Sequence, residues 1–401
     1  MDMIAYQEAL DIIAQHAGSP GQERLALEAC LNRVLAQEVV ADRDFPPFDR
    51  VTMDGIAIRH SENGPTSWTI AGVAPAGSPQ ATLDSATDCV EIMTGAMLPQ
   101  GADTIIRYED LEIADGVATL LEGVILKPGQ NIHRQGSDRQ TGEVLLAKGN
   151  KLGAAELGIA ASVGCTHLHV LEVPTAAIIS TGDELVPVGQ TPEPYQIRRS
   201  NVYSIQGSLQ RWGIQGYLYH LPDDPETMRR QLSEILTKHT LIILTGGVSM
   251  GKFDFLPQVM DDLGVQKHFH KVRQRPGKPL WFGTLPNGPV VFALPGNPVS
   301  SFMCTQVYVQ HWWQARQGIN PAPTYAALVG PMTFKPPLTY FLPCALQYSP
   351  QGVLEAMPYG GQGSGDFANL SRTDAFMILP PDKDQFEPGE VYPVVRFRDP
   401  A

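Results

Sequence analysis

The sequence lacks the features on which secreted, membrane-spanning and nucleic-acid-coating proteins depend. Five of its 401 residues are cysteines, and no two of them form a C-x-x-C pair, so we expect reduced, mostly buried thiols in a cytoplasmic protein. They are Cys30, Cys89, Cys165, Cys304 and Cys344. The N-terminus has no basic segment followed by a long apolar stretch, which argues against a signal peptide. No apolar run approaches the length of a transmembrane helix.

Positive charge is also scarce. Lys and Arg total 29 against 42 Asp and Glu, which gives a formal net charge of -13. We therefore expect no binding to nucleic acid or to an anionic membrane surface. An anionic small ligand would need a local cluster of basic residues or a metal ion to offset the negative field.

Length and composition predict a globular protein of several domains. A chain of 401 residues is too long for one ordinary core, and about two to four domains would accommodate it. Hydrophobic residues make up 43% of the chain and charged residues 18%, as is typical of globular proteins. The 34 prolines indicate many turns and domain junctions.

The most informative stretch is Leu241–Asp254. Four apolar residues predict a short buried strand, a glycine-rich turn follows at once, and a helix is expected from about Lys252 to Leu263. Glycine permits positive φ angles and leaves backbone N–H groups uncovered. Because such a turn precedes a helix N-terminus, we interpret it as a binding site for phosphate or another oxyanion.

Two other interpretations of this turn compete with oxyanion binding. Gly246–Lys252 fits G-x-x-x-x-G-K, but Phe253 stands where a P-loop needs a Ser or Thr hydroxyl. Gly247–Gly251 fits G-x-S-x-G, which would make Ser249 the nucleophile of a serine hydrolase. Its triad would need Asp254 or Asp261 with His311, and no His-Gly-Gly oxyanion stretch is present. Small residues at a strand-to-helix turn can also serve geometry alone.

The first 173 residues predict helices around an inserted β domain. Tyr6, Leu10, Ile13 and Ala17 recur at helical spacing. A second stripe with the same spacing and a later helical segment at 152–161 suggest that the two ends of this region pack together. The second stripe consists of Ala29, Leu31, Val34 and Leu35. Between about 60 and 139, short strands broken by Gly and Pro are typical of a small β domain.

Residues 174–318 alternate between strands and helices, which predicts a doubly wound, mostly parallel α/β domain. The predicted strands are 176–180, 217–221, 241–244 and 290–294, and the predicted helices are 200–212, 225–238, 252–263 and one from 298 to about 315. Loops 181–184, 223–224, 245–251, 275–279 and 295–298 follow strands, so they should gather at one edge of the sheet. Glu184, Asp223 and Asp254 on these loops would suit a hard cation such as Mg²⁺.

Two further patterns favour structural interpretations. His268 and His270 alternate along one strand, but with no third ligand in view a structural role is favoured over metal binding. The tail from about 319 to 401 predicts a small β domain. Its Gly360–Gly365 stretch is a plain hairpin turn in the structural interpretation, and a lid or an extra phosphate contact in the functional one.

Eight short motifs together resemble the MoeA family, the molybdopterin molybdenumtransferases of molybdenum cofactor biosynthesis, which are related to the E domain of gephyrin. The resemblance covers essentially the whole chain. The motifs are Pro46–Asp49, Met53–Gly55, Met93–Ala96, Thr181–Glu184, Gly246–Ser249, Pro276–Pro279, Leu294–Pro298 and Gly361–Ser364.

The resemblance implies an elongated homodimer of four-domain chains, with a multi-domain α/β plus β fold. The implied domains are a discontinuous helical N-terminal domain (1–42 and 140–173), an inserted β domain (43–139), a molybdopterin-binding α/β domain (174–318) and a C-terminal β domain (319–401). The implied reaction takes adenylylated molybdopterin and molybdate, cleaves the pyrophosphate link and yields molybdenum cofactor with AMP. Mg²⁺ is the implied cofactor, and the adenylyltransferase that makes the substrate is the implied docking partner.

The resemblance also implies which residues form the site. Asp54, Thr94 and Asp138 match positions on the inserted domain, and the two sets of residues would meet across the dimer interface. The matching positions of the other domains are Glu184, Asp223, Asp254, Lys271, Arg275, Lys278, the Pro295–Pro298 loop and Ser364, with Gly246, Gly247 and Ser249 of the glycine turn beside them. Glu184, Asp54, Asp223 and Asp254 are the expected catalytic acids. Glu184 and Asp254 are the expected metal ligands, or act in proton transfer.

Two positions depart from the family pattern, and one alternative function stays open. Arg275 stands where lysine is common, which replaces a point charge by a planar fork. Pro343 stands where many relatives have a basic residue. A non-catalytic scaffold that keeps the fold and binds partners is the alternative to catalysis.

Overall fold

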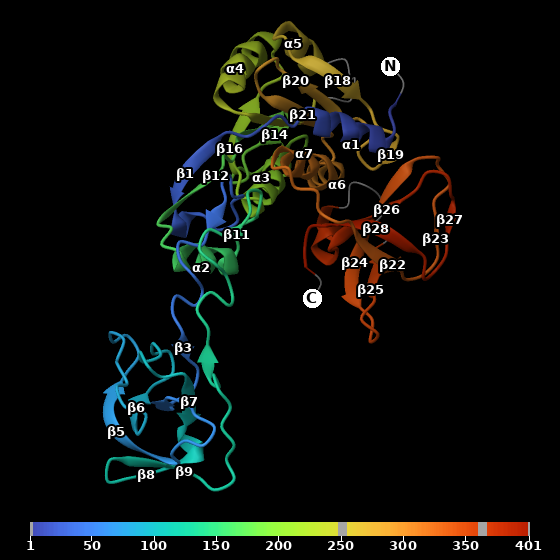
Figure 1. Ribbon diagram of the computed structural model, residues 1–401. Coiled ribbons are helices and arrows are strands. Elements are labelled where there is room, and N and C mark those ends of the chain that lie inside the picture. The colour runs from blue at the N-terminus through green and yellow to red at the C-terminus, as the bar shows by residue number, and fades with distance from the viewer. Residues whose placement is uncertain (1–2, 248–254, 360–366, 400–401) are drawn as a thin grey trace. The chain divides into compact units, whose positions relative to one another are not determined.

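The computed structural model describes residues 3–247, 255–359 and 367–399, and the chain forms two compact units. The first unit consists of Met1–Glu23 together with Leu171–Ala401, and the second is Arg24–Val170. In sequence, the second unit is therefore an insertion between an N-terminal helix and the rest of the first. Figure 1 shows the elements of both units.

A six-stranded sheet forms the centre of the first unit, in the order β16-β13-β17-β21-β20-β18. The first four strands run parallel, while β20 is antiparallel to β21 and to β18. β17 and β21 are buried along their whole length, as expected of strands covered on both faces. The strands are β13 (Thr175–Thr181), β16 (Gln215–Leu221), β17 (Leu241–Thr245), β18 (Gln266–His270), β20 (Trp281–Thr284) and β21 (Val290–Leu294).

Helices cover both faces of this sheet, so the predicted doubly wound arrangement is confirmed. One face packs against α1, α3 and the α6–η3–α7 helix, and the other packs against α4 and α5. The helices are α1 (Tyr6–Gln15), α3 (Asn201–Arg211), α4 (Pro225–Lys238), α5 (Leu256–Asp262), α6 (Pro298–Cys304), the π-helical η3 (Thr305–Val309) and α7 (Gln310–Arg316). The side chain of Asp224 caps α4 by accepting a 2.8 Å hydrogen bond from the Thr227 N–H, ahead of Pro225 at the first helical position.

The C-terminal part of the first unit is a small closed β barrel. Strands β24, β25, β22, β28 and β26 pair in that order, and β26 pairs again with β24. The predicted β domain is thus confirmed, and closure leaves these strands no free edge. The strands are β22 (Thr324–Leu328), β24 (Thr339–Tyr348), β25 (Leu354–Pro358), β26 (Ala375–Leu379) and β28 (Val391–Arg396), with the short pair β23 (Met332–Thr333) and β27 (Gln385–Phe386) and the 3₁₀ helix η4 (Phe367–Arg372) beside them.

The second unit contains a six-stranded sheet in the order β7-β4-β6-β5-β9-β8. The sequence predicts a strand at 56–59 that alternates between buried and exposed residues, but β4 is buried throughout. Separate apolar clusters cover its two faces, with Ala57 in one and Ile56 and Ile58 in the other. The strands are β4 (Gly55–Ile58), β5 (Ser67–Ala74), β6 (Asp88–Ile92), β7 (Thr104–Arg107), β8 (Leu111–Ala114) and β9 (Val117–Leu120), and the 3₁₀ helix η2 is Tyr108–Asp110.

The second predicted N-terminal helix is wrong. The apolar stripe at 29–35 instead follows the short 3₁₀ helix η1 (Leu27–Ala29) as turns and bridges, and Val34 and Leu35 make isolated β-bridges. Leu35 packs with residues of α2 (Ala154–Ser162) in a separate core, while α1 packs in the first unit. Three two-stranded sheets complete this part: β1 (Gln22–Ala26) with β12 (His167–Leu171), β2 (Val39–Val40) with β11 (Val144–Leu146), and β3 (Arg50–Val51) with β10 (Ile132–His133).

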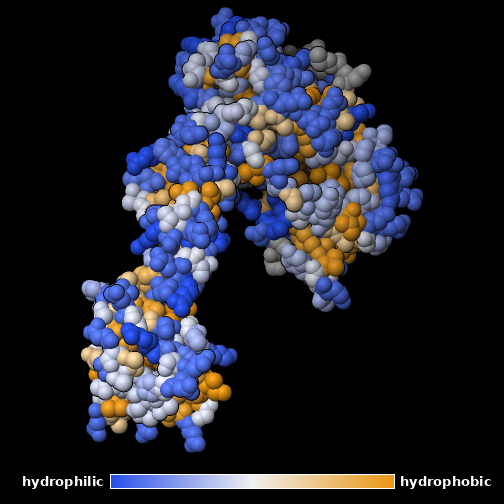
Figure 2. Space-filling model, in the orientation of Figure 1, coloured by the Kyte–Doolittle hydropathy of each residue, from blue (hydrophilic) through white to orange (hydrophobic). Residues whose placement is uncertain are grey.

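The surface seen in Figure 2 is predominantly hydrophilic on both units. Among the described residues, no helix combines the length and the hydropathy needed to cross a membrane. The five cysteines are free thiols, and four of them are buried. Burial raises the pKa of Cys344 to about 12 and that of Cys89 to about 11, so these thiols stay protonated and unreactive near neutral pH.

Candidate functional site

The carboxyl ends of β13, β16, β17 and β21 meet at one edge of the sheet, which we call the rim. Ser180 pairs with Thr245, and Thr245 pairs with Leu294, so these strands end at nearly the same level. The loops that follow them leave the sheet side by side. The prediction that these post-strand loops gather at one edge is met for the described residues.

A small cavity of ≈ 100 Å³ opens at the rim, and we call it the rim cavity. It brings together three predicted site residues, Glu184, Gly246 and Pro298. The full lining is Ser180, Thr181, Glu184, Leu185, Ile197, Arg198, Arg199, Ser200, Asn201, Val202, Thr245, Gly246, Gly296 and Pro298. Its size suits a small polar group such as a tetrahedral oxyanion, because a water molecule occupies about 30 Å³ in the liquid.

The glycine turn after β17 lies directly against the end of β13. Gly246 has φ +97°, and a Cβ atom there would lie 2.9 Å from the Thr181 hydroxyl oxygen and 3.0 Å from the Thr181 carbonyl oxygen. Gly247 has φ +67°, and its Cβ would lie 3.0 Å from the same hydroxyl. The two glycines are therefore required by backbone conformation and by close approach.

Asn201 connects two of the rim loops, and no sequence motif singled it out. It lies in the first turn of α3, and its side-chain amide donates hydrogen bonds to the Thr245 hydroxyl (3.0 Å) and to the Gly296 carbonyl (2.8 Å). The ends of β17 and of β21 are thus held by one side chain. The available signal was a Ser-Asn pair at the start of a predicted helix, which is a common capping sequence.

Glu184 owes its position to the glycine before it. A Cβ on Gly182, which has φ +126°, would lie 2.4 Å from a Glu184 carboxylate oxygen, so this carboxylate occupies the space that a side chain at 182 would need. The Glu184 carbonyl also accepts a 2.9 Å hydrogen bond from the Ile197 N–H. The acid is exposed at the mouth of the rim cavity.

Asp223 lies beside the same loop. Its backbone N–H donates a 3.2 Å hydrogen bond to the carboxylate of Asp183, which joins the loop after β16 to the loop after β13. Pro295, which follows β21 directly, is buried. The rim therefore carries several acids, and a bound oxyanion there needs positive charge nearby.

The three predicted basic residues lie at the same edge, further along the sheet. They belong to the loop after β18. The strand β18 is parallel to β21, because both are antiparallel to β20, which lies between them. Two strand spacings separate β18 from β21, or about 10 Å. Lys271 has φ +77°, a conformation that L residues other than glycine seldom adopt and that is often retained at functional sites. The three residues are Lys271, Arg275 and Lys278.

A buried glutamine fixes this basic loop. Gln274 is 1% exposed, and its amide donates a 2.9 Å hydrogen bond to the Gly277 carbonyl. The Tyr308 hydroxyl donates a hydrogen bond to the Gln274 side-chain oxygen. Because both partners are buried, the loop between Arg275 and Lys278 is tied to the helical core rather than to solvent.

The same loop also joins the C-terminal barrel. β19 (Gln274–Arg275) pairs in parallel with β24, with Arg275 opposite Tyr340, and the Arg275 guanidinium lies 5.9 Å from the Phe334 ring centroid. Pro343, the second departure from the family pattern, lies further along β24 opposite Phe376 of β26.

Asp54 and Thr94 lie together in the second unit. The Thr94 N–H donates a 2.6 Å hydrogen bond to the Asp54 carboxylate, and bonds from the Thr94 backbone and side chain hold the pKa of Asp54 below its usual value. The acid is thus ionised at neutral pH. Glycine is required at position 55, after Asp54, because a Cβ atom there would lie 1.9 Å from the Ile106 carbonyl oxygen.

Asp138 belongs to a second polar group of this unit. Its carboxylate lies 2.9 Å from His133 Nε2, and the His133 Nδ1 lies 3.1 Å from an Arg50 guanidinium nitrogen. Asp49 of the Pro-Pro-Phe-Asp motif accepts hydrogen bonds from Arg134 (2.6 Å) and from the Gln135 N–H (2.8 Å). Asp49 therefore anchors the neighbouring segment, whereas its place in a proline-rich loop alone would indicate a solvated turn acid.

Three predicted site residues, Ser249, Asp254 and Ser364, lie outside the described residues. The described partners proposed for Ser249 do not form a triad with each other, because Asp261 of α5 and His311 of α7 lie on opposite faces of the sheet. His311 instead lies 3.2 Å from the Leu10 carbonyl. Among residues 3–247, 255–359 and 367–399, no three His, Cys, Asp or Glu side chains are placed to hold a metal ion.

His268, the first histidine of the His-x-His pair, makes contacts typical of a structural residue. The His268 ring lies 3.7 Å from the ring of His16, centroid to centroid, and its Nε2 lies 2.7 Å from the Thr284 hydroxyl. Burial and the His16 charge lower the pKa of His268. These contacts join α1 to the edge of the sheet.

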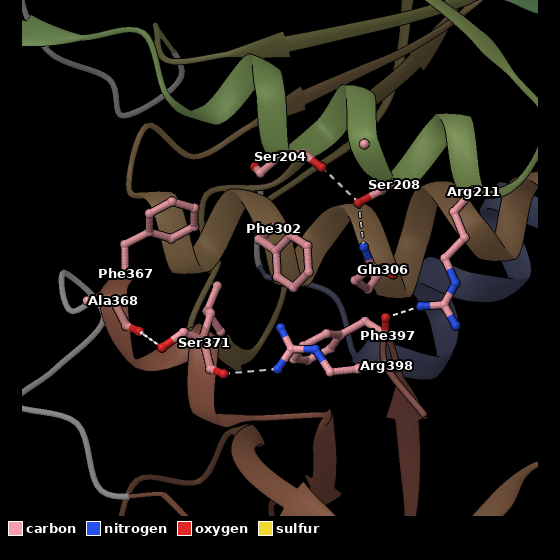
Figure 3. Close-up of a pocket in the computed structure, with 12 residues that line it drawn as sticks. Ser204, Ser208, Arg211, Phe302, Gln306, Phe367, Ala368, Ser371, Phe397 and Arg398 are labelled. Carbon is pink, nitrogen blue, oxygen red and sulfur yellow. Dashed lines mark hydrogen bonds between the residues drawn. The ribbon is translucent and has the colours of Figure 1, made fainter. Parts of the chain in front are cut away.

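A larger cavity of ≈ 480 Å³ lies between α3, α6 and η4. Figure 3 shows its two guanidinium groups turned toward backbone carbonyls. Arg211 donates a hydrogen bond to the Phe397 carbonyl, and Arg398 donates one to the Ser371 carbonyl at 3.1 Å. The cavity contains none of the predicted site residues, and its arginines stabilise the C-terminal segment.

The fold and the rim define the protein as a doubly wound α/β protein whose small polar site lies at the carboxyl ends of parallel strands. Residues 4–164 match the MoeA N-terminal region (domain I and II), residues 177–314 a probable molybdopterin binding domain, and residues 325–397 the MoeA C-terminal region (domain IV). The chain belongs to the MoeA family.

Full-length relatives agree with this assignment. The chain is 41% identical over 395 residues to the molybdopterin molybdenumtransferase of Synechocystis sp., covering 98% of this chain and 99% of that protein. It is 31% identical over 410 residues to the enzyme of the same name from Haemophilus influenzae, covering 98% and 99%. A crystal structure of a molybdopterin biosynthesis MoeA protein from Pyrococcus horikoshii superposes with a TM-score of 0.83 at 28% identity, covering 99% of this chain and 100% of that one. The family resemblance deduced from the eight motifs is confirmed.

Proposed function

We propose that this chain is a molybdopterin molybdenumtransferase, which inserts molybdenum from molybdate into adenylylated molybdopterin and releases AMP. The main observation in support is the rim cavity, which is lined by Glu184, the glycine turn and the 295–298 loop. The names of the full-length relatives support the same activity.

The chemistry requires positioning and charge neutralisation. A water oxygen attacks one phosphorus of the P–O–P link as the bond from that phosphorus to the bridging oxygen breaks. One phosphate stays on the pterin and the other leaves as AMP, so negative charge develops on the leaving oxygen, and the proton of the water is released. Groups already oriented toward that charge lower the barrier without a covalent nucleophile. Lys271, Arg275 and Lys278 would neutralise the phosphates, and the buried Gln274–Gly277 contact would keep their loop in place.

Mg²⁺ would fit at Glu184. Mg²⁺ prefers oxygen ligands and is commonly held by one or two carboxylates together with substrate phosphates. Glu184 shares the rim cavity with the hydroxyl-bearing Thr181 and Ser200, which is an oxygen-rich set; Asp254 would be the second carboxylate. When bound, the ion would supply positive charge to the phosphates. Glu184 itself would orient the ligand or hold a proton at its carboxylate.

We also propose that the working form is a cytoplasmic homodimer. Asp54 and Asp138 lie in the second unit, exposed and held by local hydrogen bonds. In a dimer, these acids and Thr94 of one subunit would border the molybdate position at the rim of the other. The adenylyltransferase that makes the substrate would dock on this enzyme, and free cysteines suit a reducing compartment.

The test is molybdate-dependent release of AMP from adenylylated molybdopterin. The wild-type protein should release AMP only when molybdate is added, and Glu184→Gln should lose most of this activity while unfolding at the same temperature. Glu226→Gln is the matched control, because Glu226 is an exposed acid of α4 outside the rim cavity. A folded wild-type protein that binds the substrate without any AMP release would favour the scaffold alternative. Stoichiometric labelling by a covalent serine probe would favour the hydrolase alternative.

A further inference from the structure

Arg199 lies between two cavities at the rim. It lines the rim cavity, and it also lines a second cavity of ≈ 180 Å³ beside it. The second cavity is lined by Ser180, Pro187, Val188, Arg199, Val202, Tyr203, Leu218, Tyr219 and His220. Arg199 is therefore the cationic side chain that both cavities share.

The guanidinium of Arg199 has unused hydrogen-bonding capacity. Its Nε atom is buried and has no hydrogen-bond partner within the described part of the chain. The neighbouring Arg198 differs, because its Nε donates a 3.2 Å hydrogen bond to the Gln190 carbonyl. Burial lowers the pKa of His220, and the charge of Arg199 lowers it further, so the positive charge acts at the end of β16 as well. A buried donor without a partner destabilises the folded state until a ligand accepts from it.

A second unsatisfied group lies on the wall of the same cavity. Thr181 is 4% exposed, and its hydroxyl has no hydrogen-bond partner among the described residues. This hydroxyl faces the glycine turn, since Cβ atoms placed on Gly246 and Gly247 would lie 2.9 and 3.0 Å from it. An oxyanion in the cavity would give it an acceptor.

The N-terminus of α3 opens onto the cavity from a third side. Ser200, Asn201 and Val202 line the cavity, and the side chain of Ser200 does not cap the eleven-residue helix. The first N–H groups of a helix lack intrahelical partners and carry a partial positive charge. The opposing charge is the Glu184 carboxylate, which faces the same space and would repel an oxyanion unless a cation offset it.

We propose that Arg199 binds a tetrahedral oxyanion of the substrates in the rim cavity, together with the Thr181 hydroxyl and the first turn of α3. The oxyanion is either the phosphate that leaves as AMP or molybdate, and this choice rests on the proposed function. Arg199 supplies positive charge close to Glu184 in addition to Arg198, whose Nε already donates to the Gln190 carbonyl.

Isothermal titration calorimetry tests the proposal with two probes, AMP and molybdate, titrated separately into wild type, Arg199→Gln, Arg199→Lys and Thr181→Val. Loss of a charge-assisted hydrogen bond weakens binding by about 10- to 100-fold, so Arg199→Gln should raise the Kd of one probe by at least about tenfold. Arg199→Lys should recover part of the loss, and Thr181→Val should weaken the same probe. The affected probe identifies the oxyanion. Arg230→Gln, an exposed arginine of α4, is the control of equal charge.

The proposal is overturned if Arg199→Gln binds both probes within about twofold of wild type, or if wild type binds neither. Should Arg199→Gln fail to fold, Arg199→Lys and Thr181→Val decide instead, and wild-type affinity in both counts against the proposal. Failure of the proposed function has a different signature. In that case wild type releases no AMP in the presence of molybdate, whatever the variants bind.

Discussion

Gly277→Ala would show how firmly the basic loop is set into the helical core. Gly277 has φ +84°, and a Cβ atom there would lie 2.7 Å from Cys304 Sγ, 2.9 Å from the Gln274 amide nitrogen and 2.9 Å from Met303 Cε. Cys304 and Met303 are fully buried, and Gln274 nearly so. The new methyl group therefore has no open space to enter, and the side chains around it must move.

The expected cost has two parts. A positive φ angle costs an L residue about 1–2 kcal/mol, and an extra methyl group in a packed core costs about 1–3 kcal/mol. We expect Gly277→Ala to lower the free energy of unfolding of the first unit by about 2–5 kcal/mol. Guanidinium denaturation followed by tryptophan fluorescence measures it. Displacement of Arg275 and Lys278 should also reduce AMP release beyond what the lost stability explains.

Gly213→Ala separates the two parts. Gly213 has a similar φ of +80°, but nothing lies within 4 Å of the position that a Cβ atom would take, so this variant should show the backbone cost alone. Adding Cys304→Ala to Gly277→Ala should recover about 1–2 kcal/mol, because it removes the closest atom, and the coupling follows from a double-mutant cycle. If Gly277→Ala costs no more than Gly213→Ala, the reasoning about core crowding is refuted.

Three other predictions concern the rim and the histidines. Gly182→Ala should push the Glu184 carboxylate from its position and lower kcat/KM for AMP release by about 100-fold, with a loss of stability of only about 1–2 kcal/mol; activity near wild type would contradict the assigned role of Gly182. Asn201→Ala should cost about 1–3 kcal/mol in unfolding free energy, since it leaves the buried Thr245 hydroxyl without its donor, and an unchanged melting temperature would count against this. Burial lowers the pKa of four histidines, so below about pH 6.5 the unfolded chain binds more protons than the folded chain. The melting temperature of the first unit should therefore fall as the pH is lowered from about 7 to 5.5. A melting temperature that calorimetry finds unchanged over this range would contradict the prediction. These histidines are His220, His239, His268 and His311.

Local sequence signals were sufficient to predict the buried parallel strands and the start of a helix. Uninterrupted apolar runs such as Leu241–Leu244 predicted buried parallel strands, and Pro225 after Asp224 marked the start of α4. Since parallel strands end at one edge, the meeting of their loops followed from topology without any coordinate. The antiparallel direction of β20 did not follow, because the local sequence of a segment does not reveal which way it runs in the sheet.

Contacts between distant segments account for what the sequence did not predict. The stripe at 29–35 has helical spacing, yet bridges to residues near 150 and 170 replace the helix. Tertiary contacts there outweigh a small difference in propensity. Arg199 belonged to no motif, and Thr181 belonged to one only as the residue before Gly182. Each has a buried side-chain atom without a hydrogen-bond partner among the described residues, a property that only packing reveals.

The pairing of β19 with β24 has a consequence for how this chain can be divided. The residues that precede Lys278 form part of the ladder of the closed barrel, so a chain shortened before Thr324 would leave those backbone groups unpaired and its arginine without the Phe334 ring beneath it. The barrel thus stabilises the loop that contains Arg275, in addition to having a hydrophobic core of its own. An excised α/β segment is expected to keep its sheet and to lose the contacts that hold Arg275 in position.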